Sequence, residues 1–137
     1  QIGDEGATKL AESLCSCKSL FLLNLSWNNI GQEGAGKLAE ALGASDALTQ
    51  LYLGRNRIGD VGVGFLAAVL GRCRSLRHLD LGRNEIGDSG VARLAGALEE
   101  CEALVHLDLG RNRIGDDGEQ CLMKLCGVSL NLSGQRA

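Results

Sequence analysis

The chain has 137 residues, about the size of one ordinary domain, and a formal net charge of −3 with acidic and basic residues interleaved. Hydrophobic residues make up 45% of it and charged residues 23%, which excludes wholesale disorder, and no apolar run approaches the roughly 18–20 residues that cross a bilayer. The mixed charge argues against a nucleic-acid partner and against a polybasic membrane surface. Glycine occurs 20 times and aromatic residues make up 3%, so the core must consist of thin aliphatic layers.

A period of 28 residues runs through the chain. Isoleucine, glycine and leucine each recur at this spacing, without insertion, from Ile2 to Leu122. The isoleucine column is Ile2, Ile30, Ile58, Ile86 and Ile114, and the leucine column is Leu10, Leu38, Leu66, Leu94 and Leu122. Self-similarity at a fixed period indicates a repeat architecture, in which each unit buries its apolar face against the next.

The period divides the chain into units, which we expect to form a single domain. In chain order they are a partial unit at about 1–19, full units at 20–47, 48–75, 76–103 and 104–126, and a terminal strand or cap at 127–137. The first unit begins in mid-repeat, so we expect a piece of a longer chain. The final strand, around Leu130, arrives 23 residues after Leu107. This leaves two alternatives: a shortened link before a cap, or an interruption of the chain.

Each full unit is expected to contain a short strand, a turn and a helix, as the unit 48–75 illustrates. Alternation around Leu51 and Leu53 predicts a strand whose leucines point inward. Asn56 then turns the chain, because its amide can pair with buried backbone groups that would otherwise lack partners. The glycines that follow permit positive φ or close approach, and the apolar spacing over 63–70 predicts one buried helical face.

The pattern L-x-x-L-x-L-x-x-N-x-I-G-x-x-G-x-x-x-L-A-x-x-L, present from Leu76 to Leu98 and from Leu104 to Leu122, carries a resemblance to a known family. It resembles the leucine-rich repeat of the ribonuclease-inhibitor type and is most similar to the repeat arrays of NOD-like receptors. The resemblance covers roughly residues 2–125. It implies an α/β solenoid with parallel strands on a concave face and helices on a convex face. In NOD-like receptors such an array senses ligands or keeps the receptor inactive.

Six cysteines raise the question of disulfides. Cys17, Cys73 and Cys101 share one repeat column, which is typical of small buried hydrophobic residues rather than of cross-links. The others, expected on helices or at helix ends, are Cys15, Cys121 and Cys126. Cysteines that remain reduced indicate a cytoplasmic or other intracellular compartment.

Two glycine-rich segments mimic nucleotide-binding motifs. Residues 31–37 fit G-x-x-x-x-G-K, but Leu38 stands where a P-loop needs Ser or Thr to hold magnesium. Residues 62–67 mimic a dinucleotide fingerprint in the same way. Both follow from glycines that recur in every repeat, so we expect no cofactor.

Polar residues recur at the outward positions of successive predicted strands. His78, Asp80, His106 and Asp108 are expected to form a two-by-two patch, because adjacent strands lie about 4.8 Å apart. Both residue types are zinc ligands, so a metal site is one interpretation, and His–Asp hydrogen bonds on a repeated surface are the other. We expect no metal, because a nearly flat patch rarely provides tetrahedral geometry. Since no nucleophile or enclosed pocket accompanies the patch, we also expect no enzyme.

Arg55, Arg83 and Arg111 are expected to form a basic ladder beside these aspartates. They could grip an acidic partner, or they could be solvated residues that are each balanced by a nearby acid. Trp27 occupies the same column one repeat earlier, with Tyr52 diagonally beside it. Exposed Trp, Tyr and Arg side chains are frequent interface hot spots, although Trp27 could instead pack against an N-terminal turn or cap.

The sequence therefore predicts a non-catalytic module that binds a macromolecular partner, a protein, through its concave strands. The candidate partner-binding residues are Trp27, Tyr52, Arg55, His78, Asp80, Arg83, His106, Asp108 and Arg111. One alternative is a scaffold subunit of a larger assembly, held by its ends or by the convex face, where Phe65 is expected to be exposed. Another is a regulator of a small GTPase, because Ran GTPase-activating proteins share the fold.

Overall fold

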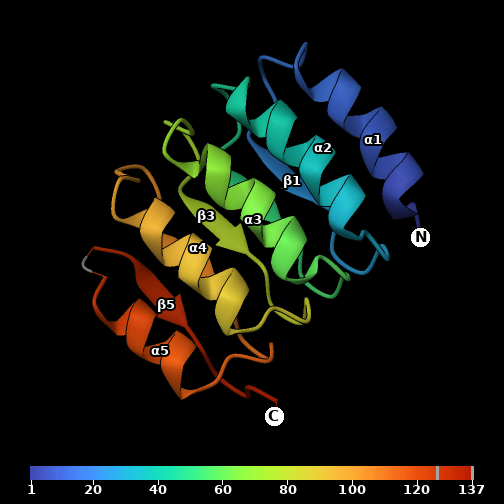
Figure 1. Cartoon of the computed structure of the whole chain (residues 1–137). Coiled ribbons are helices and arrows are strands. Elements are labelled where there is room, and N and C mark those ends of the chain that lie inside the picture. The colour runs from blue at the N-terminus through green and yellow to red at the C-terminus, as the bar shows by residue number, and fades with distance from the viewer. Residues whose placement is uncertain (126, 137) are drawn as a thin grey trace.

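The computed structural model describes residues 1–125 and 127–136, in which helices and strands alternate (Figure 1). The helices are α1 (Gly3–Leu14), α2 (Gln32–Gly43), α3 (Gly59–Leu70), α4 (Asp88–Leu98) and α5 (Asp116–Met123). The strands are β1 (Leu22–Asn24), β2 (Gln50–Tyr52), β3 (His78–Asp80), β4 (His106–Asp108) and β5 (Ser129–Asn131). None of these helices combines the length and the apolar character that a membrane crossing needs. Cys126, expected on a helix or at its end, lies outside the described residues, as does Ala137.

The strands form one parallel sheet in chain order. Leu23 faces Leu51, Leu51 faces Leu79, and Leu79 faces Leu107, so each pairing advances the chain by one repeat. In the last pairing Leu107 faces Leu130. The predicted α/β solenoid, with its strand, turn and helix in each unit, is confirmed.

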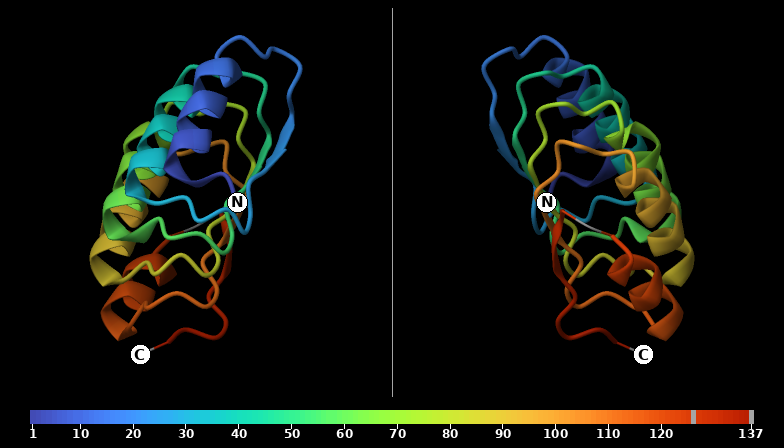
Figure 2. Two further views of the ribbon diagram at one scale, coloured as in Figure 1. Left: turned by 90° about the vertical axis from the view of Figure 1, so that its right-hand side faces the viewer. Right: turned by 90° about the vertical axis from the view of Figure 1, so that its left-hand side faces the viewer.

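The helices line one side of the array and the strands line the other (Figure 2). Neighbouring strands lie about 4.8 Å apart, whereas packed helices need about 8–10 Å between their axes. The strand side is therefore the shorter, concave side, and the helix side is convex.

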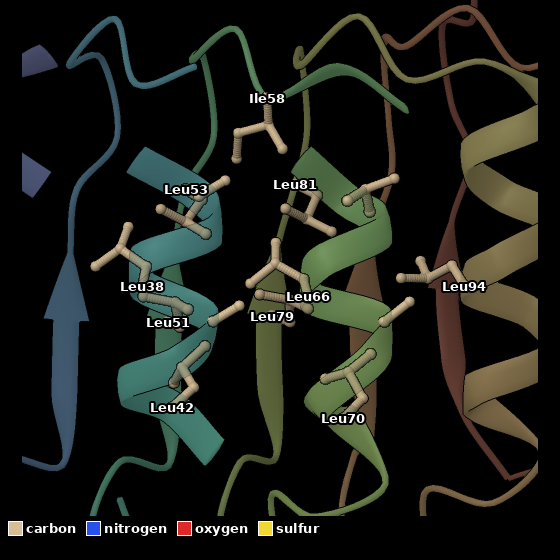
Figure 3. Packing of buried hydrophobic residues seen from close by; sticks show 14 of the residues in the cluster. Leu38, Leu42, Leu51, Leu53, Ile58, Leu66, Leu70, Leu79, Leu81 and Leu94 are labelled. Carbon is tan, nitrogen blue, oxygen red and sulfur yellow. The ribbon is translucent and has the colours of Figure 1, made fainter. Parts of the chain in front are cut away.

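Aliphatic side chains fill the layer between the sheet and the helices (Figure 3). Leu51 and Leu53 point inward from β2 and the residue after it, and Leu38 and Leu66 point inward from α2 and α3. All four are buried. Because the same layer recurs in each repeat, the core is continuous along the array although no single repeat could enclose one.

The buried asparagines pair with backbone groups, as predicted, and they also join consecutive repeats. Asn112 Oδ1 accepts hydrogen bonds from the backbone N–H groups of Asn84 at 2.8 Å and Ile86 at 3.1 Å. Its Nδ2 donates to the carbonyls of Leu81 at 3.0 Å and Leu109 at 2.8 Å. Every buried side-chain nitrogen and oxygen in the described residues has a hydrogen-bond partner. The asparagine ladder thus allows the turn backbone to be buried without loss of hydrogen bonds.

Aspartates of one repeat hold the start of the next repeat's helix, a contact that the sequence analysis missed. In each case Oδ1 accepts a hydrogen bond from the N–H of the glycine that precedes or opens the helix. The pairs are Asp4 with Gly31 at 2.6 Å, Asp60 with Gly87 at 2.7 Å, and Asp88 with Gly115 at 2.7 Å. A carboxylate at a helix N-terminus is favourable because it pairs with backbone N–H groups that have no partner within the helix.

These aspartates also decide the conformation of that glycine column. Gly31, Gly87 and Gly115 bind an aspartate and have φ values of −99°, −109° and −96°. Gly59, preceded one repeat earlier by Gln32 instead of an aspartate, has φ 62° and donates its N–H to the Asn84 carbonyl. Positive φ, which the sequence permitted throughout the column, is therefore found only where the carboxylate is missing.

Asp60 provides a pH-dependent test of these contacts. Burial tends to raise its pKa, but the Ser89 hydroxyl, the N–H groups of Gly87 and Gly90, and the charge of Arg93 together lower the pKa below its usual value. A folded pKa below the unfolded pKa means that the carboxylate stabilises the fold above the unfolded pKa. This contribution is lost as the pH falls through the folded pKa.

We therefore expect Asp60→Asn to lower the free energy of unfolding by about 1 kcal/mol at neutral pH. The difference in the free energy of unfolding between the two chains should shrink as the pH is lowered through the usual range of an aspartate pKa to about 3. Urea unfolding of both chains across this range checks the expectation. A difference that stays constant with pH would contradict it.

The last repeat is shortened between its helix and its strand. Helix α5 has 8 residues, whereas α4 has 11 and α3 has 12. Gln135 replaces the expected asparagine, since its Nε2 donates to the carbonyls of Leu109 at 2.9 Å and Leu132 at 3.0 Å. Across this shorter interval β5 keeps its register with β4, and the choice between a shortened link and an interruption of the chain stays a prediction.

Candidate functional site

The outward residues of the strands form the ladders that the sequence predicts. His78 faces His106 and Asp80 faces Asp108 across β3 and β4. Tyr52 on β2 faces Asp80. All five side chains are half-buried on the concave face, so their neighbours along the array are fixed by the register of the sheet.

The rings of three of these side chains follow one another along the concave face in a row here called the stack, in which the imidazoles of His78 and His106 stack on one another and the ring of Tyr52 is tilted by 38° to that of His78. The ring centroid of Tyr52 lies 5.2 Å from that of His78, which lies 4.6 Å from that of His106. Within the described residues the imidazoles stack on one another and form no hydrogen bond with Asp80 or Asp108, so the expected His–Asp hydrogen bonds are wrong. The ring of Tyr52 has that of His78 as its aromatic neighbour, and its predicted position diagonally beside Trp27 stays a prediction.

The two aspartates accept hydrogen bonds from backbone N–H groups just beyond the ends of their strands. Oδ1 of Asp80 and of Asp108 accepts the N–H of Gly82 and Gly110, respectively, at 2.8 Å. Burial raises the pKa of Asp80; the Gly82 hydrogen bond and the two histidines oppose this effect, and the charge of Asp108 adds to it. In the part of the chain that the structure describes, no three His, Cys, Asp or Glu side chains gather as ligands for a metal ion.

A row of four residues directly beyond the strands, here called the ridge, adopts the left-handed conformation. The ridge consists of Trp27, Arg55, Arg83 and Arg111, with φ values of 66°, 57°, 57° and 58°. A left-handed backbone costs a residue with a Cβ about 1–2 kcal/mol. In the last turn Gly134, with φ 70°, stands at the equivalent position, where glycine avoids this cost.

The next repeat holds the ridge backbone in place. The N–H of Arg55 donates to the Gly82 carbonyl at 2.8 Å, and the N–H of Arg83 donates to the Gly110 carbonyl at 2.9 Å. Alternation along the sequence predicts strands that continue to these positions, but β2 ends at Tyr52 and β3 at Asp80. This alternation could not predict the turn, because arginine and tryptophan rarely adopt positive φ.

The ridge arginines are not neutralised by ion pairs. The ion pairs of the described residues are Lys9–Glu5, Lys37–Glu40 and Arg113–Glu85, and none includes the ridge. The interpretation that these arginines are solvated residues balanced by nearby acids stays a prediction, because an acid can balance an arginine without forming an ion pair. The pKa of Arg83 is lowered by desolvation and then by the positive charges of Arg111, Arg55 and Arg136, which indicates crowding of like charges.

Trp27 ends the ridge on its N-terminal side. Its side chain is 62% exposed, and the guanidinium carbon of Arg55 lies 3.7 Å from the ring centroid. This cation–π contact holds the exposed ring beside the arginines.

The ridge borders an open groove of about 350 Å³ on the concave face. Asp80 and Asp108 also line the groove, between Gly54, Gly82 and Gly110. A Cβ atom on Gly54 would lie 2.8 Å from Asp80 Oδ2, so this glycine leaves room for the carboxylate. The structure thus brings six of the nine candidate residues to one groove, while Tyr52, His78 and His106 form the separate stack.

The convex face carries a second, more apolar groove of about 520 Å³ over α2 and α3. Phe65, which the sequence singled out, is 47% exposed there, and Val61, which it did not, is 46% exposed. A Cβ atom on Gly36 would lie 3.2 Å from Phe65 Cδ2, so the ring lies close against the α2 backbone.

The motif-like segment 31–37 already holds an anionic group. Asp4 Oδ1 accepts hydrogen bonds from the N–H groups of Gly31 at 2.6 Å and Gly34 at 3.0 Å. In a P-loop these donors would face a phosphate. Lys37 binds Glu40 instead of pointing to this site.

The described cysteines Cys15, Cys17, Cys73, Cys101 and Cys121 are all free thiols. Cys73 is buried as its column predicted, and burial raises its pKa to about 11, with a further contribution from Cys101. Cys17, in the same column, is exposed, so the prediction of burial is wrong there. Cys73 contacts the Leu42 carbonyl at the end of the preceding helix, α2, whereas within the described residues no helix precedes α1 to cover Cys17 in the same way.

Comparisons with known proteins agree with this architecture. No curated protein sequence matches the chain. The chain is similar to the solved structure of the leiomodin-1 actin-binding site 2, with a TM-score of 0.83 and 20% identity over 92% of this chain and 78% of that one. It is also similar to the tropomodulin C-terminal domain of Caenorhabditis elegans, with a TM-score of 0.77 and 18% identity over 96% of this chain and 83% of that one.

The repeats themselves identify the family. The family model described as Leucine Rich repeat matches residues 16–39, 47–67, 72–95 and 100–123. Each match includes one strand of the sheet and at least the first residues of the helix that follows. With its 28-residue leucine columns, its in-register parallel strands and its asparagine ladder, the chain belongs to the leucine-rich repeat family.

Proposed function

We propose that this chain is a non-catalytic protein-interaction module whose concave face binds a macromolecular partner. The observation that carries the proposal is the ridge, where four residues keep large side chains in a left-handed conformation that glycine would adopt at lower cost. Backbone strain of this kind persists where the surrounding structure maintains it and often accompanies binding sites. The rigid array presents these side chains in fixed order along the groove.

The candidate residues divide into two groups with different roles. The ridge, with Trp27 as its exposed aromatic anchor, provides the side chains that most often dominate binding energy. The Tyr52–His78–His106 stack provides a flatter surface beside it. Asp80 and Asp108 fix the turns that support the ridge, and they line the groove.

One structural neighbour is the actin-binding site 2 of leiomodin-1, so actin is the first named partner to test. We also propose that the repeats are of the ribonuclease-inhibitor type, similar to those of NOD-like receptors, that the units follow the boundaries given above, and that the protein acts inside cells. The scaffold alternative rests on the apolar convex groove around Phe65 and Val61. No specific observation favours the regulation of a small GTPase.

The test compares partners captured by the unaltered chain with those captured by Arg55→Gly/Arg83→Gly/Arg111→Gly. A matched control, Arg72→Ala/Arg74→Ala/Arg77→Ala, removes the same charge from the loop at the other end of the strands. Circular dichroism first establishes that all three chains are equally folded. Captured proteins are then quantified by mass spectrometry, and purified actin is tested separately by co-sedimentation.

We expect specific partners to be lost with the ridge variant and retained with the loop control. If the ridge variant captures the same partners as the unaltered chain, the concave face is not the binding surface. A further variant, Phe65→Ala/Val61→Ser, then tests the convex groove. Loss of partners with that variant alone would favour the scaffold alternative.

A further inference from the structure

The ridge arginines are an unusual group of charges for a repeated surface. Within the described residues they take part in no ion pair, although the neighbouring turn column does, through Arg113 and Glu85. A surface that keeps like charges crowded is complementary to an opposite charge supplied from outside.

We propose that the ridge binds an acidic α-helix of the partner, with about one carboxylate per helical turn facing Arg55, Arg83 and Arg111. This inference rests on the proposed function and adds the chemistry and the conformation of the bound segment. Trp27 contacts an apolar side chain at one end of that helix, because the exposed ring continues the row of arginines.

The spacing of the ridge favours a helix over an extended segment. Ridge residues follow the strand repeat of about 4.8 Å. Neighbours at i, i+3 and i, i+4 on a helix are about 5–6 Å apart. On an extended strand, residues on the same face are about 6.6 Å apart. Two ridge intervals separate Arg55 from Arg111. Over that distance the side chains on one face of a helix stay close to the ridge spacing, whereas those on one face of an extended segment are displaced from it by more than 3 Å.

The floor of the groove disfavours a flexible polyanion. Asp80 and Asp108 lie in the groove with their carboxylates held by Gly82 and Gly110. An anionic chain that settles into the groove would meet these negative charges, and like charges brought together lower affinity. A rigid helix contacts the ridge from above and does not need to enter the groove. Nucleic acid and polyphosphate are therefore expected to bind less well than an acidic helix.

The chain contains its own reporter for this test. Trp27 is the only tryptophan in the sequence, and it stands at the end of the ridge beside Arg55. The probe is an alanine-rich peptide with glutamates at positions i, i+4, i+7 and i+11 and one leucine a turn before them. Trp27 emission and the anisotropy of a fluorescent label on the peptide are followed during titration.

The controls are a peptide of the same composition with the glutamates scattered around the helix, a peptide with lysines in their place, and inorganic polyphosphate. We expect saturable binding of the patterned peptide, with a change in Trp27 emission. Arg83→Gly should weaken it about tenfold, the effect of one charge-assisted hydrogen bond. Arg74→Ala, in the loop at the other end of the strands, should leave it unchanged.

Three results would overturn the inference. The patterned peptide could fail to bind; the scattered peptide or polyphosphate could bind equally well; or Arg83→Gly could have no effect. If the ridge variant still loses its cellular partners in the capture experiment, the proposed function stands and only the acidic helix is rejected. If neither experiment depends on the ridge, both are rejected.

Discussion

Asn112→Ala is expected to lower the free energy of unfolding by about 3–5 kcal/mol, because buried groups left without a partner cost about 1–3 kcal/mol each. The side chain is 1% exposed and makes four hydrogen bonds to the backbone of two repeats. Its removal leaves the N–H groups of Asn84 and Ile86 and the carbonyls of Leu81 and Leu109 without these partners. Equilibrium urea unfolding measures the loss.

Asn28→Ala is the matched control, because Asn28 stands in the same column at the first strand of the array. It is partly exposed, and its Oδ1 accepts one exposed N–H, that of Ile2 at 3.2 Å. We expect its replacement to cost at most about 1 kcal/mol. Equal losses at the two positions would contradict the account, because they would show that the asparagine acts through its own turn rather than by joining repeats.

Leu79→Ala is expected to cost about 3–5 kcal/mol of the free energy of unfolding. Leu79 is completely buried at the centre of β3, and its neighbours on both sides of the sheet are the leucines of adjacent repeats. The strand backbone is fixed by hydrogen bonds to both neighbours, so the site cannot collapse to fill the cavity. The loss combines the transfer of the leucine atoms to water with the cost of that cavity.

Met123→Ala serves as the control for this substitution. Met123 is 79% exposed at the end of α5, and we expect its replacement to change the free energy of unfolding by less than about 0.5 kcal/mol. Comparable losses for Met123→Ala and Leu79→Ala would show that the core is not organised in the layers described above.

Most of the fold follows from sequence periodicity. Leucine columns place Leu51 and Leu79 inward, and because the period has no insertion before α5, the register of the first four strands is determined as well. The asparagine column predicts hydrogen bonds to buried backbone groups, because an amide is one of few side chains that can both donate to carbonyls and accept from N–H groups. Gln135 shows that a longer amide meets the same requirement in the last turn.

The candidate surface was less predictable, because its geometry depends on contacts between repeats. The sequence places Arg83 and Asp80 on one face, but it does not show that Asp80 binds the Gly82 backbone instead of the arginine. Positive φ at Arg83 is set by the neighbouring turn and not by the residue itself. Asp60 illustrates the same limit, since its partner Gly87 lies one repeat away and nothing in its local sequence marks it as a helix cap.

The measurement that tests the central claim most directly is equilibrium unfolding of Arg55→Gly/Arg83→Gly/Arg111→Gly. If the ridge side chains serve a partner and not the fold, glycine relieves the left-handed strain at each site. The free energy of unfolding should then be unchanged or raised by up to about 2 kcal/mol, the strain relief less the added flexibility of glycine. A decrease of about 1 kcal/mol or more would contradict the account, because it would show that the arginines hold the solenoid together.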